Sequence, residues 1–323
     1  MKEHQVPILT PTARSINAAS QAIIKGGLVA FPTETVYGLG ADATNDKAVA
    51  GIFEIKNRPK FNPLIIHVKN LELAREIVIF NDLANQLAKI FWPGALTLIL
   101  PRRNERISLL ASAGLKTLAV RAPNHNVAQA LLNKSNLPLA APSANQSGRI
   151  SPTMAKHVAS SLFDTKKNGT EVILDGGPCQ IGIESTVIDL SENKPTLLRP
   201  GGISVEEIEA VIGPLTISEG IKKGNPKSPG MLDRHYAPNL PLRLNAKKPN
   251  LNEAFLAFGP CSLMESINLS PTGNLKEAAA NLFAMINDLD RSPFTGIAIM
   301  PIPNYGLGLA INDRLKRASK PID

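Results

Sequence analysis

Short polar clusters with the chemistry to bind an anionic ligand follow several apolar stretches of this sequence. They lie at residues 32–40, 56–64, 121–123 and 141–151, and at 182–186 with 199–202. The apolar stretches before them have the length of buried strands, and α/β proteins bind ligands at the ends of such strands. Together the clusters predict a binding site built from several loops of one α/β domain.

The cluster at 56–64 is the most basic of them. It places Lys56, Arg58 and Lys60 at alternate positions, and Pro59 keeps the chain from continuing as a helix. The planar guanidinium of arginine matches two phosphate oxygens, whereas lysine supplies a compact charge. Arg121 ends another apolar stretch, where a buried arginine needs an anion beside it. These cations predict contact with phosphate or carboxylate groups.

The cluster at 141–151 consists mainly of small hydroxyl and amide side chains, which let backbone N–H groups approach a phosphate or a carboxylate. Each cluster also has a purely structural explanation, and these explanations stay open at this point. They are turn bonding for Thr35 and Ser143, helix-end charges for Lys56 and Lys60, a half-buried strand position for His67, a strand-end hydroxyl for Ser185, pairing with Glu184 or Asp189 for Arg199, and packing against a second domain for Tyr236.

Familiar catalytic motifs are absent from the sequence. It contains no G-x-x-x-x-G-K-[ST], no H-E-x-x-H, no C-x-x-C and no G-x-S-x-G. The histidines lack metal-ligand spacing, and Cys179 and Cys261 are too few for a disulfide framework or a four-thiolate zinc site. We therefore expect neither a P-loop NTPase nor a zinc hydrolase nor an α/β-hydrolase, and we predict no metal-ligating residues.

The elements that must position the clusters alternate between strand and helix. Apolar runs predict strands at 28–31, 64–68, 95–100, 118–121, 137–141, 172–174, 186–190 and 196–198. Helices are predicted at 14–25, 45–57, 81–92 and 126–132, and another from Ser151, read as an N-cap before Pro152. The pattern predicts an α/β domain over residues 1–212, which would hold the binding site.

Residues 213–239 differ from what precedes them, because they are rich in Gly, Pro, Lys and Ser and lack periodicity. Such a segment is a linker or a functional loop. Its second half contains Met231, His235 and Tyr236, which a plain flexible linker would not need, so we expect a functional loop such as a lid. Strands at 240–244, 254–258 and 296–301 and helices at 275–289 and 307–318 then predict a small Rossmann-like α/β domain over 240–323.

The charge of the chain favours an anionic partner. In 323 residues there are 35 Lys and Arg against 27 Asp and Glu, a net charge of +8, which suits a nucleotide, pyrophosphate or nucleic acid. No apolar stretch approaches the ~20 residues that span a bilayer. The first residues show no charged-then-apolar signal pattern. We therefore expect a cytoplasmic protein without a membrane partner.

Several segments together resemble the threonylcarbamoyl-AMP synthase family with its YrdC-like fold. Within residues 14–212 they are FPTETVYGLGADA, KNRPKFNPLIIHV, FWPGALTLIL, TLAVRAP, PLAAPSANQSGRISPT and GIESTVIDL with LLRPGG. SPGMLDRHYAP and the region after it resemble the long form of the family, which has an additional C-terminal domain. The resemblance implies a twisted, open, mixed α/β sheet with a concave basic face, over which the linker folds.

The resemblance also implies a reaction. Members of the family make L-threonylcarbamoyladenylate and pyrophosphate from L-threonine, bicarbonate or CO2 and ATP. A separate transferase complex then carries the threonylcarbamoyl group to an adenosine of tRNA, and weak RNA binding by this chain is a further expectation. Mg2+ is implied with ATP, held mainly by the phosphates and water.

Carried over position by position, the resemblance assigns residues to both substrates. Threonine contacts are assigned to Thr35, His67, Arg121, Ala141 and Ser185, and ATP contacts to Arg58, Asn62, Thr117, Ser143, Ser151, Arg199 and Tyr236. Lys56 and Arg58 are expected to stabilise charge on the phosphates as catalytic residues. We expect Arg121 to bind the threonine carboxylate through both arms of its fork, and Tyr236 to close over the nucleotide.

Two other functions compete with this interpretation. The same domain occurs in carbamoyltransferases that handle a carbamoyl-adenylate, but those proteins carry cysteine pairs that two lone cysteines do not supply. A module that binds double-stranded RNA or tRNA without chemistry also fits the charge. Such a module has no need for the set Thr35, His67, Arg121 and Ser185.

Overall fold

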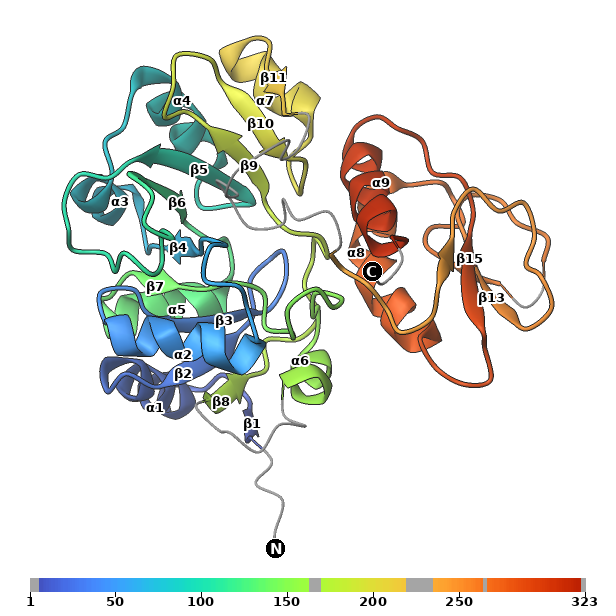
Figure 1. Ribbon diagram of the computed structural model, residues 1–323, viewed down its shortest axis with the longest axis horizontal. Helices are drawn as coiled ribbons and strands as arrows, with labels where there is room; N and C mark the ends of the chain where they lie inside the picture. The colour runs from blue at the N-terminus through green and yellow to red at the C-terminus, as the bar shows by residue number, and fades with distance from the viewer. Residues whose placement is uncertain (1–5, 163–169, 219–234, 264–265, 321–323) are drawn as a thin grey trace, which may run out of the picture.

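A mixed sheet forms the centre of the larger domain (Figure 1). The computed structural model describes residues 6–162, 170–218, 235–263 and 266–320. Within these ranges the sheet has 11 strands in the order β1-β8-β2-β3-β7-β4-β6-β5-β9-β10-β11. The strands are β1 (Ile8–Leu9), β2 (Leu28–Phe31), β3 (Gly38–Asp42), β4 (Ile65–His67), β5 (Leu96–Pro101), β6 (Thr117–Arg121), β7 (Leu139–Ala140), β8 (Thr170–Leu174), β9 (Thr186–Asp189), β10 (Thr196–Arg199) and β11 (Thr216–Ile217). The expected α/β class with a mixed sheet is confirmed.

Helices pack on this sheet, and polar caps fix where several of them begin. The helices are α1 (Ala13–Ile24), α2 (Asp46–Lys56), α3 (Leu71–Ile77), α4 (Asp82–Phe91), α5 (Asn126–Ser135), α6 (Ala155–Leu162) and α7 (Val205–Ile212). Asn45 and Asn81 accept backbone N–H groups of α2 and α4, as predicted for N-caps. Asn57 ends α2 in the left-handed conformation, with φ 47°, and so turns the chain directly before Arg58.

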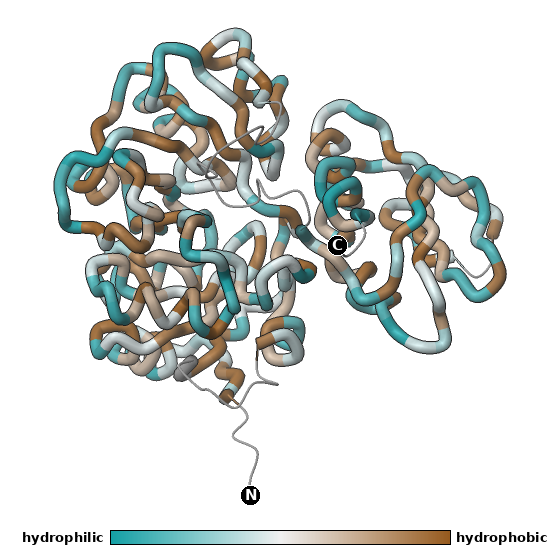
Figure 2. The backbone as a smooth tube through the Cα atoms, in the orientation of Figure 1, coloured by the Kyte–Doolittle hydropathy of each residue, from teal (hydrophilic) through white to brown (hydrophobic). Residues whose placement is uncertain are grey.

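The two faces of the sheet have different surroundings. Side chains alternate between faces along a strand, so Ile66 and Val120 join the large core under the helices, while Ile65 and Ala119 join a small apolar cluster on the other face. Figure 2 shows apolar stretches in the chain of both domains. The parallel pairing of β4 with β6 sets His67 opposite Arg121, on the same face as Ile65 and Ala119. This face carries the polar residues of interest.

Several local predictions differ from the structure. Ser151 does not cap a helix: α6 begins at Ala155, and the Ser151 hydroxyl donates to Glu184 instead. Part of the polar cluster 32–40 is strand β3, because pairing with β2 and β7 outweighs the low strand propensity of its glycines. Helices α3 and α7 were not predicted. Strand β11 pairs with β10, so the sheet continues beyond the expected boundary at 212.

The C-terminal domain is a four-stranded sheet with helices on it, within the described residues. Its strands are β12 (Leu242–Arg243), β13 (Glu253–Ala257), β14 (Ile267–Asn268) and β15 (Gly296–Ile299), and its helices are α8 (Leu275–Leu289) and α9 (Leu307–Ala318). All of its strand pairs are parallel, in the order β12-β15-β13-β14, as the strand–helix alternation predicted. No helix in the described ranges has both the length and the apolar character that crossing a membrane requires.

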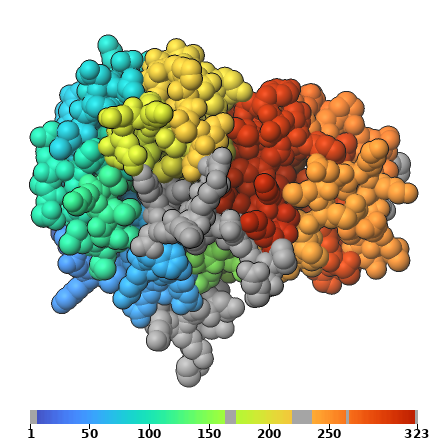
Figure 3. Space-filling model, turned by 45° about the horizontal axis from the view of Figure 1, so that its top comes forward, coloured from blue at the N-terminus to red at the C-terminus, as the bar shows by residue number. Residues whose placement is uncertain are grey.

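The two domains share an apolar cluster. Val36, Ile150 and Ile183 of the larger domain are buried in the same cluster as Leu282 and Phe283 of α8. Gly182 packs closely against this helix, since a Cβ placed on it would lie 2.5 Å from Cα of Ala280. In Figures 1 and 3 the C-terminal domain lies directly against the larger domain, with α8 and α9 on the facing side. The domains are therefore in intimate contact.

Candidate active site

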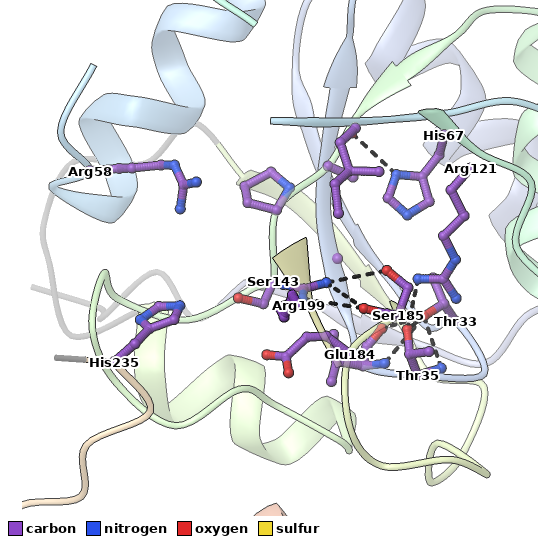
Figure 4. A pocket seen from close by; sticks show the side chains of 15 residues that line it. Thr33, Thr35, Arg58, His67, Arg121, Ser143, Glu184, Ser185, Arg199 and His235 are labelled. Carbon is purple, nitrogen blue, oxygen red and sulfur yellow. Dashed lines mark hydrogen bonds between the residues drawn. The ribbon is translucent and has the colours of Figure 1, made fainter. Parts of the chain in front are cut away.

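A polar pocket opens on the face of the sheet that carries His67 and Arg121 (Figure 4). It is lined by Thr33, Thr35, Val36, Gly38, Arg58, Ile65, His67, Arg121, Ala141, Pro142, Ser143, Glu184, Ser185, Arg199 and His235. These residues come from the clusters that the sequence singled out and from the segment that enters the C-terminal domain. Figure 4 shows a pocket with two ends: Arg58 and His235 lie at one, and His67, Arg121 and Thr35 at the other.

Arg121 organises the first end. Its Nη1 donates to the Thr35 hydroxyl at 2.9 Å, its Nε donates to the carbonyl of Gly94 at 3.1 Å, and its Nη2 lies 2.6 Å from Oε1 of Glu34. The anion that a buried arginine requires is therefore a protein carboxylate. Thr35 also shares a hydrogen bond with Thr33 at 2.8 Å. Arg121 thus fixes the Thr33–Thr35 loop at the pocket wall.

His67 is neutral at this end of the pocket. Burial, with the Arg121 guanidinium beside it, lowers the pKa of His67 to about 3. Its Nδ1 lies 3.4 Å from the carbonyl of Ile65 and, facing an acceptor, carries the proton. The ring packs edge-to-face against Phe31, with centroids 6.1 Å apart. Nε2 is left as an acceptor, which suits an ammonium or hydroxyl donor of a ligand.

Arg199 lies between the two ends, and Ser185 lies beside Thr35 at the end with Arg121 (Figure 4). The Ser185 hydroxyl shares a hydrogen bond with Thr97 at 2.7 Å. Arg199 Nη2 donates to the carbonyl and the hydroxyl of Ser185, at 2.9 and 3.2 Å. Ser143 adjoins this region, joined to Gly38 by a single antiparallel bridge. The guanidinium and the hydroxyls place donors from the middle of the pocket to its first end.

Arg58 forms the second end with His235. Its Nε and Nη2 donate to the carbonyls of Asn62 and Pro63, at 3.2 and 3.0 Å, which holds the side chain against its own loop. Burial lowers the pKa of Arg58 to about 10, so it remains cationic at neutral pH. Burial also lowers the pKa of His235 to about 3, with nearby cations adding to the effect. This end is therefore cationic through Arg58, beside a neutral imidazole.

Lys56 lies behind the pocket wall, not in it. The ammonium of Lys56 donates to the carbonyl of Ser143 at 2.6 Å and to that of Asn145. The Lys56 residue is only 1% exposed. Burial, with Arg58 beside it, lowers the pKa of Lys56 well below its ordinary value. The structure thus differs from the expectation that Lys56 faces the phosphates: it holds the 143–145 loop that lines the pocket.

The assigned residues fall into two groups. The described lining includes Thr35, Arg58, His67, Arg121, Ala141, Ser143, Ser185 and Arg199. It does not include Lys56, Asn62, Thr117, Ser151 or Tyr236. Thr117 begins β6, on the same face as Arg121 but four residues away along the strand. Asn62 is buried at 2% exposure, and its Oδ1 has no hydrogen-bond partner among the described residues.

Tyr236 lies between the pocket and the C-terminal domain. It is 1% exposed, contacts the ring of His235 at 4.2 Å between centroids, and stacks on Phe283 at 5.5 Å. The following residue, Ala237, donates its N–H to the carbonyl of Gly148 at 2.9 Å. Residues 219–234, most of the expected lid, lie outside the described residues.

Sequence reasoning left several residues near the pocket unassigned, and Glu184 and Arg314 matter most among them. Glu184 lines it, and its only proposed role was as a partner of Arg199. The other is Arg314 of α9, whose Nε donates to Oε2 of Glu184 at 2.8 Å. The position of Glu184 within the polar cluster 182–186 was a usable signal. Arg314 offered none, because it lies in an ordinary polar stretch of a helix 130 residues away.

Comparisons with known proteins agree over nearly the whole chain. A family model of the Sua5, YciO and YrdC proteins, described as telomere recombination, matches residues 21–201. A second, described as the C-terminal domain of threonylcarbamoyl-AMP synthase, matches residues 203–320. The threonylcarbamoyl-AMP synthase of Bacillus subtilis is 41% identical, covering 94% of this chain and 92% of its own. That of Pyrococcus abyssi is 43% identical, covering 94% of each.

A solved structure has the same arrangement of both domains. The crystal structure of P. abyssi Sua5 complexed with L-threonine matches with a TM-score of 0.87 and 40% sequence identity, covering 97% of each chain. The likeness therefore includes the C-terminal domain as well as the sheet that carries the pocket.

Proposed function

The chain belongs to the threonylcarbamoyl-AMP synthase family, and from this we propose that it makes L-threonylcarbamoyladenylate from L-threonine, bicarbonate or CO2 and ATP, with release of pyrophosphate. One observation carries the proposal to this chain's own residues. The pocket has a polar end built on Arg121, Thr35 and His67, and a cationic end built on Arg58. A small amino acid and a polyphosphate nucleotide need these two environments within reach of each other.

We assign threonine to the end with His67 and Arg121. The hydroxyls of Thr35 and Ser185 and the neutral Nε2 of His67 can pair with the hydroxyl and amine of the substrate. Arg121 already contacts Glu34 and Thr35, so two-armed binding of the carboxylate requires it to exchange one of these contacts. Even while both contacts are kept, the positive charge of Arg121 attracts the carboxylate of a threonine bound nearby.

We assign the nucleotide to the end with Arg58, Ser143 and Arg199. Arg58 and Arg199 are buried residues, at 7% and 3% exposure, and a phosphate contact in such surroundings is stronger than in water. Asn62 lies in the Arg58 loop outside the described lining, and its Oδ1, which has no partner among the described residues, is an acceptor that the base could reach if this loop moves on binding. Lys56 serves as a positioning residue, because it holds the carbonyls of the Ser143 loop.

The reaction then needs no covalent protein intermediate. The neutral amine of threonine attacks CO2, losing a proton, and forms N-carboxythreonine. The carboxylate oxygen of this carbamate attacks the α-phosphorus of ATP, and the bond from that phosphorus to the α,β-bridging oxygen breaks as the β- and γ-phosphates leave as pyrophosphate. Arg58 and Arg199 offset the charge that accumulates on the phosphates. Covering the pocket during turnover would keep water from the carbamate and the adenylate.

Mg2+ enters this proposal as part of the MgATP substrate. The described residues contain no group of three or more His, Cys, Asp or Glu placed to hold a metal ion. Both oxygens of the pocket carboxylate, Glu184, already accept hydrogen bonds from Ser151 and Arg314. The donor set therefore suits Mg2+ carried by phosphates and water. We expect the product to pass to a tRNA threonylcarbamoyl transferase complex, and we propose that the protein works in the cytoplasm.

Pyrophosphate release from ATP tests the proposed function. We expect release only when L-threonine and bicarbonate are both present, with threonylcarbamoyl-AMP as the second product by mass spectrometry. A module that only binds RNA would release no pyrophosphate. Turnover that does not depend on threonine would favour a carbamoyl-adenylate-handling enzyme. Either result would contradict the proposal.

A further inference from the structure

A carboxylate of the pocket is held from behind by the C-terminal domain. Glu184 accepts a hydrogen bond on Oε2 from Nε of Arg314 at 2.8 Å, and another on Oε1 from the Ser151 hydroxyl at 2.6 Å. Arg314 is 1% exposed and Glu184 7%. Neither Ser151 nor Arg314 is part of the pocket lining that the structure describes. Both partners therefore bind Glu184 from outside the space that a ligand would occupy.

Arg314 is itself fixed by further contacts. Its Nη1 donates to Asp313 at 2.6 Å, and its guanidinium carbon lies 5.1 Å from the centroid of the Tyr236 ring. Tyr236 in turn stacks on Phe283 of α8. These contacts orient the guanidinium of Arg314 toward the larger domain, where it binds the carboxylate of Glu184.

The negative charge of Glu184 makes its contact with Arg314 important for binding a nucleotide. Glu184 is the one carboxylate among the described lining residues. The cationic side chains of that lining are Arg58, Arg121 and Arg199. An unpaired negative charge at that position would repel the triphosphate of an incoming nucleotide and attract the nearby guanidinium of Arg199. Arg314 shares the neutralisation of Glu184 with Arg199 from outside the pocket, so it weakens the repulsion without occupying the ligand's space.

We propose that Arg314 is a positioning residue for the nucleotide end of the active site, which it serves by holding Glu184 and offsetting its charge. The C-terminal domain then contributes directly to ATP binding, although Arg314 does not touch the substrate. The inference rests on the proposed function for the identity of the nucleotide. It adds a role for the C-terminal domain and names the residue through which it acts.

The ionisation of Glu184 supports this role. Burial alone would raise the pKa of its carboxyl, but Arg314 and Arg199 hold it at about 2. The groups that face Glu184 are Arg314 from α9, Arg199 from β10, and His235 and Tyr236 from the segment before the C-terminal domain, while Asp313 pairs with Arg314 behind it. The histidine among them is neutral, so the offsetting charge comes from the arginines.

The test combines Arg314→Met with Glu184→Gln in the full-length protein. We expect Arg314→Met to raise KM for ATP about tenfold or more, with KM for threonine changed less than about twofold. The same loss should appear without turnover, in calorimetric binding of a non-hydrolysable ATP analogue. Arg314→Met/Glu184→Gln should recover to within about threefold of the unaltered protein, because no charge is left to offset and the amide oxygen still accepts from Ser151.

Arg243→Ala is the matched control. It breaks another arginine–glutamate pair of the same domain, with Glu253 at 2.5 Å, whose arginine side chain is 39% exposed. This variant should leave both KM values unchanged. Equal rises in both KM values for Arg314→Met, or no recovery in the double variant, would overturn the inference in favour of a purely structural contact.

Two further comparisons keep the test decisive. If Arg314→Met does not fold, Glu184→Gln is compared with the double variant: equal KM values for ATP support the inference, and a difference of about tenfold overturns it. The dependence of the unaltered protein on threonine and bicarbonate tests the proposed function separately. An unaltered protein that passes that test, with Arg314 variants that bind ATP normally, would leave the function intact and the inference wrong.

Discussion

Arg58 is the residue whose loss should most clearly separate phosphate binding from stability. Its side chain is buried in the pocket, whereas Arg75 of α3 is exposed and donates to Asn85 at 2.9 Å. We expect Arg58→Ala to lower kcat/KM for ATP about ten- to a hundred-fold, because a charge-assisted contact contributes about 1.5–3 kcal/mol. Arg75→Ala should leave it within about twofold. Equal activities in the pyrophosphate assay would contradict the phosphate assignment.

His67 should make stability depend on pH in a predictable direction. Its pKa is about 3 in the folded chain, below the ordinary value of 6.5, so only the unfolded chain takes up a proton between these values. Stability should therefore fall as the pH drops below about 6.5, by about 1.4 kcal/mol per pH unit for this group.

Replacing His67 by glutamine removes that proton uptake. Urea unfolding between pH 6.5 and 5 should then show a shallower loss of stability for His67→Gln than for the unaltered protein. NMR should find no titration of the His67 ring above pH 4 in the folded chain. Identical slopes for the two proteins would show that His67 is not held neutral.

At the level of the helices and strands, Gly182 sets how closely α8 approaches the larger domain. Gly182 and Gly177 both have positive φ, at 73° and 81°, but only at Gly182 would a Cβ meet neighbouring atoms, 2.5 Å from Cα of Ala280. Both alanine variants incur the left-handed strain of about 1–2 kcal/mol. Gly182→Ala must also displace α8, which adds about 1–3 kcal/mol.

We therefore expect Gly182→Ala to lower the midpoint of thermal unfolding more than Gly177→Ala. It should also reduce activity under conditions where the protein remains folded, because α8 supports Tyr236 beside the pocket. A Gly182→Ala variant as stable and active as Gly177→Ala would mean that the close packing of α8 is not required.

In the molecule as a whole, one apolar cluster joins the two domains. Phe283 and Phe255 are both buried in the C-terminal domain, at 1% and 4% exposure, but only Phe283 belongs to the cluster that includes residues of the larger domain. Either alanine variant should lose about 3–5 kcal/mol of stability. Only Phe283→Ala should also raise KM for ATP, because it removes the ring on which Tyr236 stacks.

This comparison is made at a temperature where both variants remain folded by circular dichroism. Stability losses of similar size with different KM values would separate an effect on the active site from one on folding. If both variants show the same KM for ATP as the unaltered protein, the domain contact has no part in nucleotide binding.

The sequence by itself determined most of the long helices and central strands and the polar segments at their ends, although not α3, α7 or β3. Periodicity and capping residues such as Asn45 and Asn81 act within a few neighbours, so the helices and strands they predict agree with the structure to within a few residues. The polar loops that hold Thr35, Arg58, His67, Arg121 and Ser185 converge on one pocket as expected.

Only the tertiary structure decided which of these groups pair with one another. Lys56 donates to carbonyls of another loop. Ser151 binds Glu184 and does not cap a helix. Glu184 in turn is bound by Arg314, which lies 130 residues away in the sequence. No local pattern records such pairs, because a buried charge is satisfied by whichever partner the packing brings near. Here that partner depends on how α8 and α9 pack against the larger domain.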